Sequence, residues 1–132
     1  MSAPRILPVG DAALLGETEN IDTAAALYDA LAAARPGVRE LVAGARTVLV
    51  RYAPAETDAA ALAAWIGGLR LGTGARDEGA LVRVPVVYDG EDLDDVAQLT
   101  GLRRAEVIRR HTAAEYRVAF TGFAPGFAYL VG

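Results

Sequence analysis

The sequence has 132 residues, of which 53% are hydrophobic and 23% charged, so it can bury a core and is not typical of a disordered chain. A formal net charge of −4 argues against general nucleic-acid binding, and the lack of cysteine and lysine excludes disulfides, thiolate chemistry and Schiff bases. No apolar run is long enough to span a membrane and the N-terminus lacks the apolar centre of a signal peptide, which predicts a cytoplasmic protein.

The first elements predicted along the chain are two strands and a helix. Residues 5–9 and 12–17 have the composition of short strands around the turn dipeptide Gly10-Asp11. The helix is expected to begin at Asn20 or Asp22 and to run to about residue 35, because Pro36-Gly37 ends it. Its apolar face consists of Leu27, Tyr28, Leu31 and Ala34.

A second pair of strands and a second helix follow. Residues 38–43 and 46–52 are predicted to form a hairpin around Gly44-Ala45, because residues 48 to 51 alternate between two faces. Thr57 is expected to cap the next helix, and Gly67-Gly68 weakens its last turn. The apolar stripe of this helix consists of Leu62, Trp65, Ile66 and Leu69.

Residues 71–79 are polar and glycine-rich, which predicts a loop, and residues 81–88 are predicted to form a strand. Pro85 places this strand at a sheet edge or at a bulge, because proline cannot donate to the ladder. The order strand–strand–helix–strand–strand–helix–strand predicts an α+β domain of ferredoxin-like type over residues 1–88. A boundary is expected near residues 89–91.

Two short helices are predicted next, over residues 93–100 with Asp92 as the cap and Gly101 as the stop, and over residues 103–111. Their spacing of small, turn and apolar residues also fits a helix-turn-helix, with four arginines available for phosphate contacts: Arg103, Arg104, Arg109 and Arg110. Nearby acidic residues cancel this charge, which favours a structural helix pair over DNA binding.

A strand over residues 116–120 leads into the C-terminal segment, in which glycines and a proline alternate with aromatics. Glycine permits positive φ and proline restricts φ, so we expect a shaped loop rather than an ordinary strand or helix. Such a loop would display Phe123, Phe127 and Tyr129, with the amides around Gly122 and Gly126 as hydrogen-bond donors. The alternative is a loop that caps the core and packs its aromatics inward.

Specific motifs carry a family resemblance. His111, Glu115-Tyr116-Arg117-Val118 and the pattern Gly122-Phe123-x-Pro125-Gly126-Phe127-x-Tyr129-Leu130-x-Gly132 closely resemble the B-subunit family of bacterial 5-oxoprolinase, also called allophanate hydrolase subunit 1. That family includes Kip-type inhibitors of a sporulation histidine kinase. Weaker matches occur in the same order and spacing, over residues 8–15, 36–42, 46–52, 84–88 and 92–97.

The resemblance implies a subunit of an ATP-dependent hydrolase complex that opens 5-oxoproline or hydrolyses allophanate. It implies ATP at the level of the complex, with none evident in this chain, and a C-type subunit (allophanate hydrolase subunit 2) as the partner; the alternative partner is a histidine kinase. Residues 89–132 would be a helical connector and the opening of a cyclophilin-like barrel that is incomplete at Gly132. The chain is therefore expected to be a fragment or a natural truncation, inactive alone.

The resemblance also indicates candidate residues for ligand or partner binding, although it identifies no catalytic residue. They are His111, Tyr116, Gly122, Phe123, Pro125, Gly126, Phe127 and Tyr129. For His111 the alternative is a structural role at a helix C-terminus, where the helix dipole favours a cation. A metal site is not expected, because a single histidine without cysteine rarely suffices.

Overall fold

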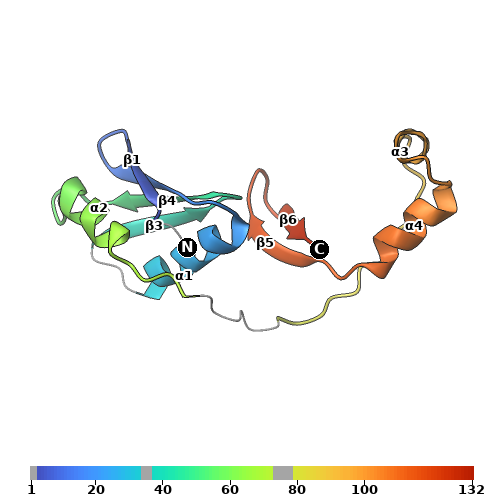
Figure 1. Ribbon diagram of the computed structural model, residues 1–132. Helices are drawn as coiled ribbons and strands as arrows, with labels where there is room; N and C mark the ends of the chain where they lie inside the picture. Colours follow the sequence, from blue (N-terminus) through green and yellow to red (C-terminus); the bar gives the residue numbers. More distant parts are fainter. Residues whose placement is uncertain (1–2, 34–36, 73–78) are drawn as a thin grey trace. The chain divides into compact units, whose positions relative to one another are not determined.

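The computed structural model describes residues 3–33, 37–72 and 79–132 (Figure 1). It divides into two compact units, residues 1–75 with 118–130, and residues 76–117 with 131–132. The elements of the first half are β1 (Arg5–Val9), β2 (Ala13–Glu17), α1 (Ile21–Ala33), β3 (Val38–Ala43), β4 (Thr47–Tyr52) and α2 (Ala59–Gly67). Those of the second half are α3 (Leu93–Thr100), α4 (Arg104–Ala113), β5 (Arg117–Thr121) and β6 (Ala128–Val131).

The first four strands form one antiparallel sheet in the order β1-β2-β4-β3. Each strand lies within one residue of its predicted bounds, because period-two alternation is a strong local signal. The register pairs Leu14 of β2 with Val50 of β4, and both side chains are buried. Residues at odd and even positions therefore face opposite sides of the sheet, and this pair faces the core.

The core lies on one face of this sheet, beneath both α1 and α2. Leu27 and Leu31 of α1 and Leu62 and Ile66 of α2 are all at most 2% exposed and belong to one cluster with the β2 and β4 side chains. Burial of each such side chain contributes about 1.5–3 kcal/mol relative to exposure. Gly16 permits the close approach of α1, because a Cβ there would lie 2.8 Å from Cδ2 of Leu27.

Helices α1 and α2 each begin at a residue whose side chain caps the helix N-terminus. Asn20 caps α1, since its Oδ1 accepts a hydrogen bond from the Thr23 backbone N–H at 2.9 Å and Thr23 Oγ1 accepts from the Asn20 N–H. The prediction of Thr57 as the cap of α2 is wrong: Asp58 is the cap, and its carboxylate accepts from the Ala61 N–H at 2.9 Å. The Thr57 side chain instead lies against Gly37. The predicted end of α1 at residues 34–36 falls outside the described residues.

The strand predicted over residues 81–88 is not formed, and this prediction is wrong. The edge of the sheet beside β2 is occupied by β1, and the apolar side chains of the segment are exposed, from 54% at Val86 to 81% at Val87. The order β2-α1-β3-β4-α2 matches the first five elements of the β-α-β-β-α-β motif. The sixth element of the motif is a strand, but in the described residues the next element after α2 is the helix α3. The α+β class is thus confirmed, whereas the ferredoxin-like type stays a prediction. Most of the predicted loop over residues 71–79 lies outside the described residues.

The second half contains the predicted helix pair. Gly101 ends α3 in the left-handed conformation with φ of 68°, as expected of a helix C-terminal glycine, whereas Asp92 makes no side-chain cap bond. Helix α4 begins one residue later than predicted and ends at Ala113, two residues beyond His111. In the described part of the chain, no helix has both the length and the apolar character needed to cross a membrane.

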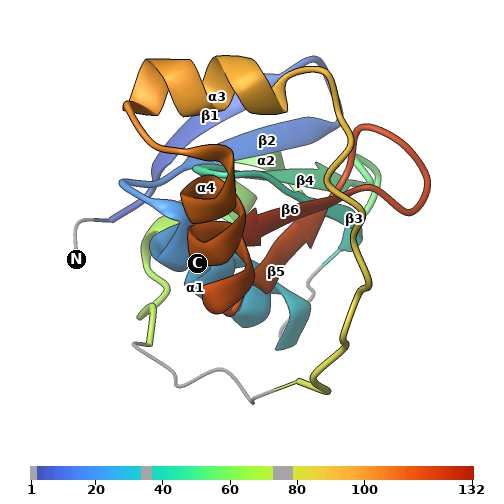
Figure 2. The ribbon, with the colours of Figure 1, turned by 90° about the vertical axis from the view of Figure 1, so that its right-hand side faces the viewer.

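The C-terminal segment was expected to contain no strand, and this is wrong for its last residues. Residues 128–131 form β6, which pairs with β5 in a two-stranded sheet (Figure 2). The reason is that this stretch alternates small, aromatic and branched side chains after the turn, a pattern suited to a strand. The cyclophilin-like identity of the second part stays a prediction, as does the boundary near residues 89–91.

Candidate functional site

The loop between β5 and β6 contains two consecutive tight turns over residues 122–127, which we call the hairpin loop. The Ala124 N–H donates to the Gly122 carbonyl at 2.8 Å, which makes a γ-turn centred on Phe123. The Phe127 N–H then donates to the Ala124 carbonyl at 3.0 Å, around Pro125 and Gly126. Proline followed by a glycine with φ of 77° is the pattern of a type II turn. The local sequence therefore accounts for the path of this loop.

Phe123 has an unusual backbone for its side chain. Its φ is 67°, and it is the one non-glycine residue with positive φ in the described chain. A bulky residue in this region of φ and ψ is strained by about 1–3 kcal/mol. Its side chain is also 89% exposed, so burial of the ring within the described residues does not offset this strain. The loop thus presents one large apolar ring to its surroundings.

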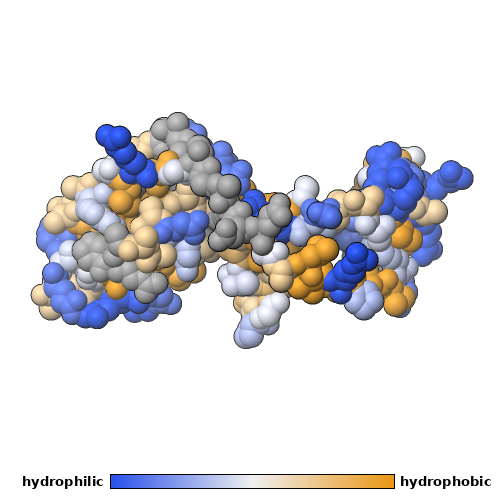
Figure 3. Space-filling model, turned by 90° about the horizontal axis from the view of Figure 1, so that it is seen from below, coloured by the Kyte–Doolittle hydropathy of each residue, from blue (hydrophilic) through white to orange (hydrophobic). Residues whose placement is uncertain are grey.

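Four aromatic rings make a continuous series along the β5–β6 hairpin. Phe120 stacks on Tyr129 with ring centroids 4.5 Å apart, Tyr129 meets Phe127 edge to face at 5.3 Å, and Phe127 meets Phe123 edge to face at 5.4 Å. Each contact has a geometry that aromatic pairs prefer. Phe127 and Tyr129 are 45% and 41% exposed, so the described residues leave these rings only partly covered. On the face seen in Figure 3, hydrophobic residues, drawn in orange, are exposed in several places.

The hairpin loop differs from the sequence prediction in its hydrogen-bond donors. The Gly122 N–H is not free for a ligand, because it donates to the Phe127 carbonyl at 3.2 Å. The Ala124 and Phe127 amides close the two turns. The Gly126 N–H makes no backbone hydrogen bond to any described residue. Residues 120–132 also contain no charged side chain, so the loop offers mainly apolar surface.

A second group of predicted site residues meets in the other unit. The Tyr88 hydroxyl lies 2.5 Å from Nδ1 of His111, and the two rings contact edge to face with centroids 5.7 Å apart. The centroid of the His111 ring also lies 5.2 Å from that of the Tyr116 ring. We call Tyr88, His111 and Tyr116 the tyrosine–histidine cluster. His111 sits in the last turn of α4, as the structural alternative proposed, but its ring binds a tyrosine side chain.

Tyr88 is the residue that sequence reasoning missed. It was interpreted as the end of a strand, and it lies 23 positions from His111 in the chain. No local periodicity connects positions so far apart. The sequence offers only a single histidine and five dispersed tyrosines, and these indicate a pair only after the fold is known.

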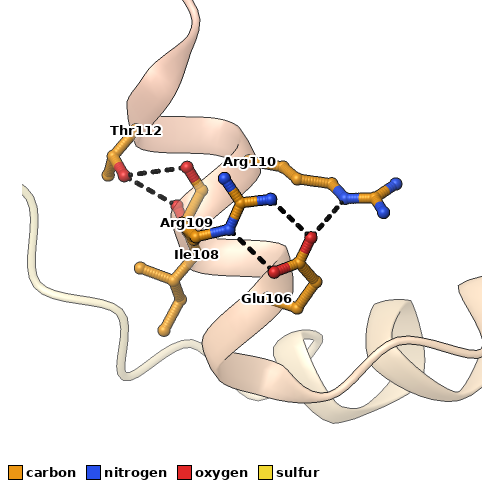
Figure 4. Close-up of polar contacts among 5 residues, drawn as sticks. All are labelled: Glu106, Ile108, Arg109, Arg110 and Thr112. Carbon is orange, nitrogen blue, oxygen red and sulfur yellow. Dashed lines mark hydrogen bonds and ion pairs between the residues drawn. The ribbon is translucent and has the colours of Figure 1, made fainter.

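The arginines of α4 are engaged by acidic neighbours. Glu106 accepts from Arg109 at 2.7 and 2.8 Å and from Arg110 at 2.8 Å (Figure 4). These hydrogen bonds, first from Arg109 and then from Arg110, lower the pKa of Glu106 from 4.5 to about 2. Arg104 pairs with Asp94 at 3.2 Å. Three of the four arginines considered for DNA contacts are thus already ion-paired, which disfavours phosphate binding by this helix pair.

The eight predicted site residues therefore fall into two groups, one in each unit. Six lie in or beside the hairpin loop (Gly122, Phe123, Pro125, Gly126, Phe127 and Tyr129), and two lie in the tyrosine–histidine cluster (His111 and Tyr116). Their role in ligand or partner binding stays a prediction. Within the described residues, no group of three or more His, Asp or Glu side chains could hold a metal ion.

The sequence of residues 4–132 matches the family described as the carboxyltransferase domain, subdomain C and D, so the chain belongs to this family. Two curated relatives are each named as the B subunit of 5-oxoprolinase. The protein from Bacillus subtilis (strain 168) is 49% identical over 55 residues, and the one from Escherichia coli O157:H7 is 45% identical over 56 residues. These matches confirm the resemblance to the 5-oxoprolinase B-subunit family.

The matched regions are partial on both sides. They cover 39% and 40% of this chain, and 23% and 26% of the two relatives. Among solved structures, TTHA0988 in space group P212121 matches 98% of this chain with a TM-score of 0.64 at 34% identity, and the same protein in space group P6522 matches 91% with a TM-score of 0.67 at 31% identity. The chain spans about a quarter of that protein, 26% and 24% in the two structures.

Proposed function

We propose that the protein acts as a subunit of an ATP-dependent hydrolase complex of the 5-oxoprolinase type. Its similarity to two proteins named as the B subunit of 5-oxoprolinase supports this function most directly. In this complex the chain contributes a binding surface, the hairpin loop, rather than a complete active site. The exposed rings of Phe123, Phe127 and Tyr129, in a segment without charged side chains, support that role, because aromatic residues are preferred anchors of binding surfaces.

The chemistry of the reaction explains why other subunits would be needed. The lactam of 5-oxoproline is an unstrained amide and resists attack by water at neutral pH. Phosphorylation of its carbonyl oxygen would create a leaving group, so coupling to ATP is chemically reasonable. The sequence contains no phosphate-loop motif and no lysine, and three arginines of α4 are paired with acids, which favours nucleotide binding outside this chain. We therefore assign nucleotide binding to a partner, the C-type subunit.

Reconstitution tests this assignment. The purified chain is assayed for ATP-dependent formation of glutamate from 5-oxoproline, alone and with a C-type subunit. We expect no turnover by the chain alone and binding between the two proteins. Turnover without a partner would contradict the proposed division of labour. Binding to a histidine kinase, with no binding to the C-type subunit, would favour the regulatory alternative.

A further inference from the structure

The tyrosine–histidine cluster has a polar atom with no assigned role. Tyr88 precedes α3, His111 lies in the last turn of α4, and Tyr116 precedes β5, so three separate segments of one unit converge on a single imidazole. Tyr116 is held on its far side by Gly132, where a Cβ would lie 2.7 Å from the Tyr116 ring. The His111 ring is thus positioned by contacts with two tyrosine rings and by one short hydrogen bond.

The direction of that hydrogen bond follows from the chemistry of the two groups. A phenol is a good donor and a weaker acceptor, because its oxygen lone pair is delocalised into the ring. An imidazole nitrogen with a free lone pair is a good acceptor. The Tyr88 hydroxyl is therefore assigned as the donor and Nδ1 of His111 as the acceptor. In the neutral ring the remaining proton then resides on Nε2.

Nε2 is the atom available to a ligand. His111 is an exposed residue, and the only side-chain hydrogen bond it makes within the described chain is the one at Nδ1. A fixed N–H beside two tyrosine rings can recognise a small cyclic molecule with an acceptor oxygen. The rings would supply apolar walls, and the N–H would supply orientation.

We propose that Tyr88 is a positioning residue that holds His111 as the Nε2–H tautomer, and that this N–H donates a hydrogen bond to an acceptor oxygen of a small lactam acid. The ligand class rests on the proposed function, since 5-oxoproline is such a molecule. It has two kinds of acceptor oxygen, the lactam carbonyl and the carboxylate. The positioning role of Tyr88 is new, and so is the assignment of Nε2 as the contact atom.

The single histidine makes the tautomer directly measurable. Long-range proton–nitrogen NMR of the chain labelled with ¹⁵N-histidine reports the state of one imidazole only. We expect the pattern of the Nε2–H tautomer at neutral pH, and in Tyr88→Phe a shift toward a mixture of tautomers. Tyr28→Phe is the matched control, because it also removes a phenol hydroxyl but lies in α1, outside the cluster, and leaves the bond between Tyr88 and His111 intact. An unchanged tautomer in Tyr88→Phe would overturn the positioning role.

Ligand titrations monitored at Nε2 test the second half of the proposal. The probes are 5-oxoproline, 2-pyrrolidinone, which has only the lactam, and tetrahydro-2-furoate, which has the carboxylate without the lactam. We expect 5-oxoproline to shift the Nε2 signal, one of the other two to do so more weakly, and Tyr88→Phe to weaken binding about three- to tenfold, as for loss of one hydrogen bond. Tyr28→Phe, which also removes a phenol hydroxyl but lies in α1 outside the cluster, should retain the affinity of the unmodified chain within about twofold.

The result of the ligand titration can be distinguished from the test of the proposed function. If no probe shifts the Nε2 signal, either in the chain alone or in its complex with a C-type subunit, the ligand assignment is overturned. Glutamate formation by the same complex would then still support the proposed function. Conversely, a fixed tautomer with 5-oxoproline bound at Nε2 supports the inference even if the reconstituted complex forms no glutamate.

Discussion

Phe123 combines a strained backbone with an exposed ring, and these two properties seldom occur together without a functional reason. Strain of this kind persists where the surrounding structure imposes it, and it concentrates at binding and catalytic positions. Here the imposing structure is the pair of turns, closed by amides of the loop itself. Because the ring is 89% exposed, its removal should affect binding more than folding.

Replacement of Phe123 by glycine tests this separation. Relief of the positive φ should recover about 1–3 kcal/mol, and the greater freedom of glycine in the unfolded chain should cost about 0.5–1 kcal/mol. We therefore expect Phe123→Gly to be at least as stable as the unmodified chain in urea unfolding. Binding to the partner subunit should fall at least tenfold, as for an interface hot spot. A loss of stability of more than about 2 kcal/mol would show that the ring is structural.

Gly126 and Gly122 provide a matched pair of substitutions that tests the turn at Pro125 and Gly126. Both have space for a methyl group, since nothing lies within 4 Å of a Cβ at Gly126 and only Tyr129 lies at 3.9 Å at Gly122. Of these two glycines, only Gly126 has a positive φ, 77°. We expect Gly126→Ala to destabilise the chain by about 1–2 kcal/mol and Gly122→Ala by less than about 0.5 kcal/mol. Equal effects in thermal unfolding would contradict the type II turn.

Gly126 and Phe127 together test the binding role of the loop. If the loop contributes only stability, partner binding in Gly126→Ala and in Phe127→Ala should decrease in proportion to their unfolding free energies. We expect both variants to lose more affinity for the partner than their loss of stability explains. Phe127 is 45% exposed, so its truncation should cost less than the roughly 3–5 kcal/mol of a fully buried phenylalanine.

At the scale of elements, α4 is organised around Glu106. This carboxylate accepts from two adjacent arginines one turn further along, at i+3 and i+4, which supports the helix and neutralises its basic face (Figure 4). Glu106 thus stabilises α4 and, by pairing with its arginines, also makes the helix less suited to bind phosphates. The helix pair is therefore interpreted as a structural connector.

The pKa of Glu106 predicts how this arrangement responds to acid. A carboxyl whose folded pKa is lowered from 4.5 to about 2 adds stability that is fully present above pH 4.5. That stability is lost as the pH falls through about 2. We expect the stability difference between the unmodified chain and Glu106→Gln to be largest near neutral pH and to disappear by about pH 2. A difference that does not change between pH 6 and about pH 2 would contradict the ion pairs.

The same variant tests the DNA alternative. We expect no measurable binding of duplex DNA by the unmodified chain at physiological salt. If Glu106→Gln frees Arg109 and Arg110, weak binding that falls steeply with salt should be confined to this variant. Salt-dependent binding by the unmodified chain, abolished by replacing Arg103, Arg104, Arg109 and Arg110, would favour the helix-turn-helix.

At the scale of the whole molecule, the second half of the chain retains much apolar surface. Val118, Leu130 and Phe127 are 53%, 55% and 45% exposed, and the segment over residues 81–88 adds further exposed valines. Apolar surface of this kind promotes association, as do strand edges without a neighbour. This agrees with the proposed function as one subunit among several.

Light scattering checks this property. We expect the purified chain to dimerise or to aggregate as its concentration rises, and to bind a partner subunit when one is added. Val118→Thr combined with Leu130→Thr should reduce self-association without affecting the core of the N-terminal sheet, in which neither residue takes part. A chain that stays monomeric at high concentration would contradict the prediction.

The sequence by itself determined the strands and helices of residues 5–67, because alternation and helical spacing are repeated within each element and need no distant partner. It also indicated the turn positions of the hairpin loop, since glycine and proline restrict the backbone locally. Only the tertiary structure decided that residues 81–88 form no strand, that Ala128–Val131 pairs with β5, and that Tyr88 meets His111. Each of these features depends on contacts between segments that are far apart in the chain. The local sequence pattern does not indicate which distant segments come into contact.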